Sequence, residues 1–208
     1  RKVLRDGNVA LFGPATGITD GRILTPAPAS RLLGVPMELL PRTTVRHVIL
    51  QDPAGGHPIT REMPAACVYG DSLPYGPTLV PGEWAVEKNR AVPLGHANVC
   101  WFIHRTGLFL KEFGRGPAGN GKGGGRGAGD YGIVWSVAMP LPANLLRACA
   151  RYAGSTIWCE EDDVIYASDS IASIHSVKSG PRTLKLPGRF TVTDAVTGKL
   201  VGRRMNAV

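Results

Sequence analysis

Short apolar runs, most of them ended by glycine or proline, predict a chain built from brief strands and helices. Residues 8–14 form an apolar run that ends in a Gly-Pro turn, and residues 132–138 form a second run of the same kind. Both are typical of buried strands. Residues 98–104 are apolar almost throughout, which predicts a central strand covered on both faces. Residues 43–51 alternate and are rich in β-branched side chains, so we expect another strand there, while residues 109–113 fit a strand or a turn of helix.

Two segments carry the three-to-four spacing of apolar residues that indicates helices. The first covers residues 28–35 and ends at Gly34, with Ala29 and the two following leucines on one face. The second covers residues 143–154, has Gly154 at its end, and is expected to bury Leu146. Because a strand, a tight turn and a helix follow one another here, the pattern favours an α/β fold.

The pattern changes after Gly154. Short strands are predicted about ten residues apart, separated by Asp-Asp, Ser-Gly-Pro, Pro-Gly and Thr-Gly turns, over residues 156–159, 164–167, 171–177, 183–186 and 190–194. This spacing indicates a small antiparallel sheet or half-sandwich. We therefore expect a domain boundary near Ser155, with one domain over residues 1–155 and another over residues 156–208. Residues 52–93 are rich in proline and glycine and predict short strands at best.

Composition excludes several classes without naming a function. The 208 residues include 27 glycines and 17 prolines, which agrees with many turns. No apolar run reaches the ~18 residues of a membrane span, and no signal peptide is visible. The four cysteines contain no Cys-x-x-Cys pair, and their pattern favours a reducing compartment such as the cytoplasm.

The net charge of +8 suits either a nucleic-acid partner or a basic surface with no anionic partner. Lys122 and Arg126 lie in a glycine-rich segment, residues 114–129, where they are candidate anion-binding residues. The spacing from Gly116 to Lys122 matches a phosphate loop, but Gly123 stands where that loop needs a magnesium-binding Ser or Thr. The segment is therefore either an RNA-contacting stretch or a flexible connection between strands.

No catalytic centre, metal site or cofactor site is predicted. The chain has no Gly-x-Ser-x-Gly or Gly-x-Cys-x-Gly nucleophile turn, and its five histidines lack His-x-x-x-His spacing. The acidic run at residues 160–163 is expected to be a solvated turn, since four adjacent acids cannot converge on one bond. Three aromatic residues, Tyr75, Trp84 and Trp101, are candidates for stacking on a sugar, with local packing as the alternative.

The order of elements resembles one family of carbohydrate-active enzymes. Residues 132–154, a strand followed by Pro-Leu-Pro and Leu-Leu-Arg-Ala-Cys-Ala-Arg-Tyr-Ala-Gly, resemble the end of the trimerisation domain in family 42 β-galactosidase-like glycoside hydrolases. Residues 162–198 are similar to the small C-terminal β-domain of these enzymes. Residues 9–14 and 30–34 resemble the opening strand and helix of the same glutamine-amidotransferase-like fold.

The resemblance implies a flavodoxin- or glutamine-amidotransferase-like α/β layer followed by a small antiparallel β-domain. It also implies a homo-oligomer, with a trimer favoured, that helps to shape a carbohydrate active site. The family's catalytic acids lie on a (β/α)₈ barrel of ~250 residues, so none of them carries over, and the chain is expected to be non-catalytic by itself. Residues 55–93 and the glycine-rich segment have no counterpart in the family. The alternative functions are a basic nucleic-acid-binding module and a free-standing carbohydrate-binding module.

Overall fold

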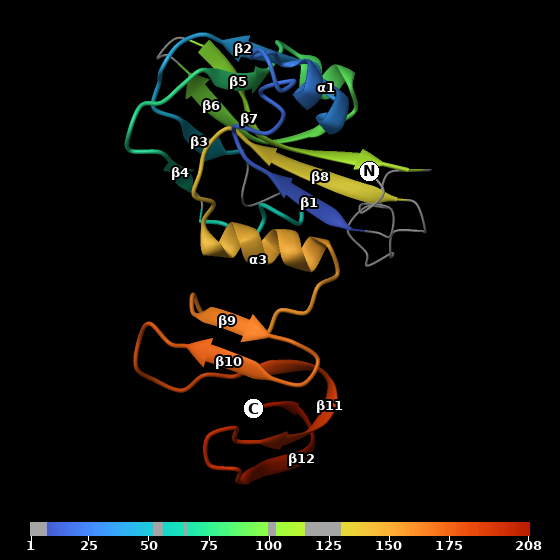
Figure 1. The fold of residues 1–208 in the computed structure, drawn as a ribbon, viewed down its shortest axis with the longest axis vertical. Helices are drawn as coiled ribbons and strands as arrows, with labels where there is room; N and C mark the ends of the chain where they lie inside the picture. Colours follow the sequence, from blue (N-terminus) through green and yellow to red (C-terminus); the bar gives the residue numbers. More distant parts are fainter. Residues whose placement is uncertain (1–7, 52–55, 65, 100–102, 115–129) are drawn as a thin grey trace. The chain divides into compact units, whose positions relative to one another are not determined.

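The computed structural model describes residues 8–51, 56–64, 66–99, 103–114 and 130–208 (Figure 1). The chain divides into two compact units, Arg1–Ala153 and Gly154–Val208. Each unit has its own sheets, so each is described by itself.

A six-stranded mixed sheet forms the centre of the first unit. One pair of its strands, β1 and β8, is parallel, and the other paired strands are antiparallel. Every residue of β8 is buried, as expected for a central apolar strand. In spatial order the strands are β1 (Val9–Phe12), β8 (Tyr131–Ser136), β7 (Ile103–Phe113), β6 (Val92–Val99), β3 (His47–Leu50) and β4 (Val68–Gly70).

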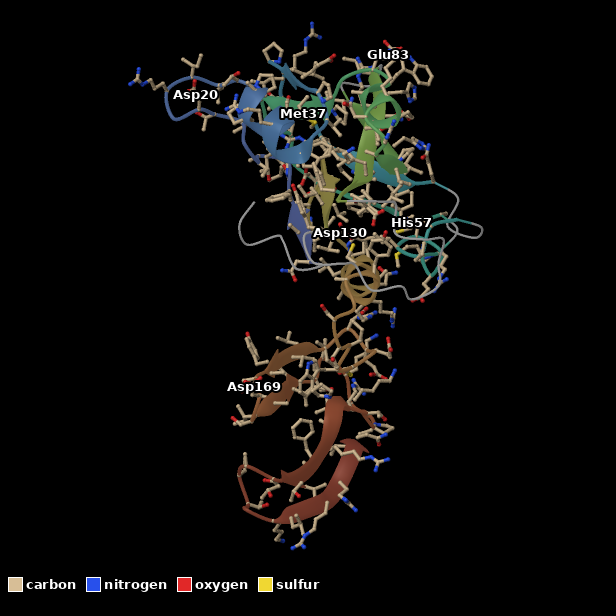
Figure 2. All side chains as sticks on the ribbon, turned by 90° about the vertical axis from the view of Figure 1, so that its right-hand side faces the viewer. Asp20, Met37, His57, Glu83, Asp130 and Asp169 are labelled. Atoms are coloured by element: carbon tan, nitrogen blue, oxygen red, sulfur yellow. The ribbon has the colours of Figure 1, made fainter. Side chains whose placement is uncertain are left out.

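Smaller elements lie on both sides of this sheet. The two-stranded sheet of β2 (Met37–Leu40) and β5 (Thr78–Pro81) lies on the same side as helix α1 (Ala27–Leu33), and helix α3 (Ala143–Tyr152) lies on the other (Figures 1 and 2). A one-turn helix, α2 (Ala85–Lys88), follows β5. The helix predicted at residues 28–35 is confirmed, with Ala29 and Leu33 fully buried and Gly34 ending it at φ 67°.

The fold contains more strand than an α/β layer would. Strands make up 41% of the structure and helices 12%, and the sheet is mixed and curled. The strand predicted at residues 98–104 is wrong as a single element. Strand β6 ends at Val99 and β7 begins at Ile103, and the two pair as neighbouring antiparallel strands. The apolar run thus includes the end of one strand and the start of the next, and apolarity alone does not mark that boundary.

Helix α3 confirms the predicted helix but corrects its buried face. Leu145, Ala148 and Cys149 are buried, whereas Leu146, which we expected in the core, is 41% exposed. Adjacent leucines at the start of a helix lie about 100° apart, so only one of them can face the sheet. Gly154 follows the last turn at φ 77°, the left-handed conformation that glycine adopts most easily.

The second unit consists of two antiparallel hairpins. Strands β9 (Val164–Ala167) and β10 (Ala172–His175) form one, and β11 (Lys185–Thr193) and β12 (Leu200–Ala207) form the other. The strands predicted at residues 183–186 and 190–194 are parts of the one strand β11. Residues 156–159 are not a strand, and β12 was not predicted. Of residues 154–208, all of which are described, only Cys159 is buried.

Candidate functional site

Tyr75, one of the predicted sugar-stacking residues, has one ring face covered by a cation. It lies between β4 and β5, and the guanidinium carbon of Arg46 stands 3.2 Å from its ring centroid. Arg46 Nη2 also donates a 2.5 Å hydrogen bond to the Tyr75 carbonyl oxygen. The backbones of Thr44 and Tyr75 pair as an isolated antiparallel bridge. Any ligand of Tyr75 would therefore meet the opposite ring face or its edge.

Arg46 is a buried cation that interacts electrostatically with the nearby Asp71 carboxylate. Its side chain is sequestered from solvent, and neither Arg46 Nε nor Asp71 Oδ2 has a hydrogen-bond partner among the described residues. Burial lowers the pKa of Arg46, and the nearby Tyr75 and Asp71 groups oppose that shift. Burial likewise raises the pKa of the Tyr75 phenol, and the nearby Asp71 carboxylate adds to that increase. Together with the hydrogen bond from the Asp71 amide to the Arg46 carbonyl oxygen, these contacts join the segment 71–75 to the residues just before β3.

Trp84, the second of the predicted sugar-stacking residues, is exposed to solvent, whereas one face of the Tyr75 ring is covered. Its side chain is 64% exposed and its backbone adopts φ 58°, ψ 10°, in the left-handed region. A bulky residue rarely occupies this region, since its Cβ is then crowded by the backbone. Trp84 stands directly before α2, where its carbonyl oxygen accepts a hydrogen bond from the Lys88 amide at 3.1 Å.

The predicted aromatic residues do not form one site. The β2–β5 ladder pairs Leu40 with Thr78 at one end and Met37 with Pro81 at the other. Tyr75 lies beyond the first end and Trp84 beyond the second, so the length of β5, at about 3.3 Å per residue, separates them. The third predicted residue, Trp101, lies outside the described residues.

The anion-binding prediction cannot be placed in the structure. Lys122 and Arg126 lie in the segment 115–129, outside the described residues. Within the part of the chain that is described, no helix is long and apolar enough to cross a membrane.

A pocket that the sequence did not suggest lies between β6 and the segment 56–60. Its volume is about 500 Å³. His57 is fixed in its wall, because its Nδ1 accepts the Ile59 amide hydrogen at 3.2 Å and its ring lies 5.1 Å from that of Tyr152. The lining residues are Gln51, Gly56, His57, Thr60, Val92, Pro93 and Leu94. Because these residues come from separate segments of the chain, no local motif could have revealed the pocket.

In the second unit, Asp163 corrects the expectation of a fully solvated acidic turn at residues 160–163. Only 3% of its side chain is exposed, and it forms an ion pair with Arg182 Nε. It also accepts hydrogen bonds from the Val177 amide at 2.9 Å and the Ser176 hydroxyl at 3.3 Å. The hydrogen bond from Arg182 is the largest of the effects that lower the pKa of Asp163. This carboxylate therefore ties the start of β9 to the segment after β10.

Other candidate chemistry is sparse in the described residues. Among them, no group of three or more His, Cys, Asp or Glu side chains is placed to hold a metal ion. Cys67, Cys149 and Cys159 are free thiols, and burial raises the pKa of Cys149 to about 12, which keeps that thiol protonated. The Cys159 thiol donates a 2.8 Å hydrogen bond to Glu161.

Comparison with known proteins identifies no relative. No protein-family model, curated protein or solved structure matches the chain.

Proposed function

We propose that this chain is a non-catalytic, C-terminal part of a β-galactosidase-like glycoside hydrolase that assembles copies of the protein into a homo-oligomer, with a trimer favoured. In this proposal the first unit is a divergent amidotransferase-like layer, and the oligomer helps to shape a carbohydrate active site. The parallel pair of β1 and β8, followed in the chain by α3, supports the comparison with that layer.

The observation that carries the proposal is the exposed apolar surface of residues 154–208. An isolated two-stranded hairpin is at best marginally stable in water, and a unit of this size needs apolar burial to hold its shape. Yet large apolar side chains remain exposed throughout the unit, namely Val164, Tyr166, Ile171, Val177, Phe190, Val196, Leu200, Val201 and Val208. Surfaces of this kind are typical of protein interfaces.

The β9–β10 hairpin offers the most regular part of this surface. Cross-strand pairing places Tyr166 opposite Ser173 and Val164 opposite His175, so these four side chains share one face. Tyr166 is 70% exposed. An aromatic ring surrounded by smaller side chains is a common centre of binding energy in interfaces.

The test is the mass in solution, measured by light scattering behind a sizing column at several concentrations. We expect a closed oligomer for the unchanged chain and its dissociation in Tyr166→Lys, because the substitution places a charge in the apolar contact. Ala195→Lys is the matched control, since Ala195 is exposed in the turn between β11 and β12 and is not one of these large apolar side chains, so lysine there should not cost the oligomer. A monomer at every concentration would contradict the proposal.

A further inference from the structure

We propose that Trp84 is a stacking platform for a sugar ring, with the carboxylates of Glu83 and Glu87 as hydrogen-bond acceptors for its hydroxyl groups. This inference rests on the carbohydrate part of the proposed function, but it does not depend on assembly. It assigns the ligand to the exposed turn between β5 and α2 rather than to Tyr75 or to the pocket beside His57. In Figure 2, Glu83 lies near the top of the first unit and His57 lies well below it, so the proposed site is separate from the pocket beside His57.

The backbone of Trp84 supports a role other than packing. The left-handed conformation is unfavourable for a non-glycine residue, and the exposed indole recovers little of that cost through burial. Burial of the side chain therefore does not explain a tryptophan at this position, and the backbone conformation would favour glycine. Residues held in such conformations cluster at functional sites.

The surroundings of Trp84 favour a sugar over a protein partner. Three exposed charged residues lie close to it in the chain, Glu83 before α2 and Glu87 and Lys88 within it, whereas Ala85 and Val86 are buried. Charged side chains such as these are depleted in the cores of protein interfaces. A sugar ring needs the arrangement found here, because its C–H face packs on the electron-rich indole face while its hydroxyls bond to charged groups at the edge.

The turn of α2 brings charged residues close to Trp84. The Lys88 amide donates a 3.1 Å hydrogen bond to the Trp84 carbonyl oxygen, so this single turn places the backbone of residues 87 and 88 next to that of Trp84. In the proposed site their side chains contact the edge of a ring stacked on the indole.

The test uses lactose as the probe, titrated at millimolar concentration into the full chain and followed through the indole N–H resonances by NMR. We expect the Trp84 resonance to shift with saturation, and sorbitol, an open-chain polyol, to give no saturable shift. Trp84→Gly should lose binding by at least about tenfold while melting at the same or a higher temperature, because glycine relieves the backbone. Trp84→Tyr should retain part of the affinity.

Arg90→Gly is the matched control. Arg90 also has a positive φ, 54°, and lies just after α2, so its replacement relieves a similar backbone conformation without removing the indole. It should leave lactose binding unchanged. The inference is overturned if lactose gives no Trp84 shift, if Trp84→Gly binds as well as the unchanged chain, or if Trp84→Gly unfolds, since the indole would then have a structural role.

Repeating the titration on Tyr166→Lys separates this inference from the proposed assembly. Lactose binding that persists in a monomer supports the Trp84 site whatever the fate of the oligomer. A stable oligomer that binds no lactose overturns the Trp84 site and leaves the assembly proposal standing.

Discussion

At the scale of single residues, charged side chains with little exposure connect segments of the chain that apolar packing does not connect. Arg46 is covered by the Tyr75 ring and interacts electrostatically with the Asp71 carboxylate in the first unit. Asp163 is paired with Arg182 in the second. Removing one member of a buried pair leaves the other without compensation, which costs more than the pair itself contributes. Both arrangements therefore predict large effects for single substitutions and smaller effects for paired ones.

Replacing Arg46 by Met should lower the free energy of unfolding by roughly 3 kcal/mol. The methionine keeps much of the side-chain volume but leaves the Asp71 carboxylate without its cation, and it removes the hydrogen bond to the Tyr75 carbonyl oxygen. Urea denaturation followed by circular dichroism measures the change. Arg46→Met combined with Asp71→Asn should recover part of the loss. A double variant that is less stable than Arg46→Met alone would show that the carboxylate has another role.

Asp163 should make the second unit sensitive to acid. Its pKa is held below the ordinary value of 3.8, so the carboxylate stabilises the folded unit above about pH 4 and loses this effect as the pH falls through the lowered pKa. The protection of the β9 and β10 amides, meaning the ratio of the intrinsic exchange rate to the observed rate at the same pH, should therefore fall below pH 4. In Asp163→Asn the protection should be lower already at pH 7 and should depend less on acid. Asp169→Asn, at the exposed turn between these strands, should behave like the unchanged chain.

At the scale of elements, periodicity identified α3 but not the face that it buries. The two leucines at its start are equivalent in a sequence pattern, and only the position of the sheet distinguishes them. Strand β8 was predicted because all of its residues are apolar or small. The structure shows that all of them are buried. Strand β6 was missed because it contains Pro93 and Gly95, which normally mark turns. The β6–β7 register shifts beside these residues, so the strand accommodates them as an irregularity.

The two leucines of α3 provide a direct test of its orientation. Leu145→Asp should cost roughly 4 kcal/mol or more, because Leu145 is 0% exposed and the carboxylate would be buried without a partner. Leu146→Asp should change stability by no more than ~0.5 kcal/mol, since that side chain is 41% exposed and lies near the helix start, where negative charge is tolerated. Thermal melting of both variants measures the difference. Equal losses would mean that the helix is rotated from the position described here.

At the scale of the whole molecule, the division of the chain could be predicted because it follows from the local spacing of turn residues. The change in character after Gly154 follows from turn spacing, and the two units Arg1–Ala153 and Gly154–Val208 divide the chain close to that point. The candidate site was less predictable. The sequence singled out Tyr75 and Trp84 as aromatic residues in a loop-rich segment, but only the structure shows that Arg46 covers one ring and that a strained backbone presents the other. Such contacts depend on residues far apart in the sequence.

The unequal burial in the two units leads to a prediction about how the molecule unfolds. The first unit has an extensive apolar core, whereas residues 154–208 bury little besides Cys159. If copies of the chain cover the apolar face of the second unit, mass action should raise its melting temperature as protein concentration rises. The melting of the first unit, which depends on its own core, should change much less. Amide exchange resolved by residue, measured over a hundredfold range of concentration, separates the two responses. A second unit whose exchange is independent of concentration would mean that its exposed side chains do not contact another copy, and the assembly proposal would then fail while the Trp84 site remained open to its own test.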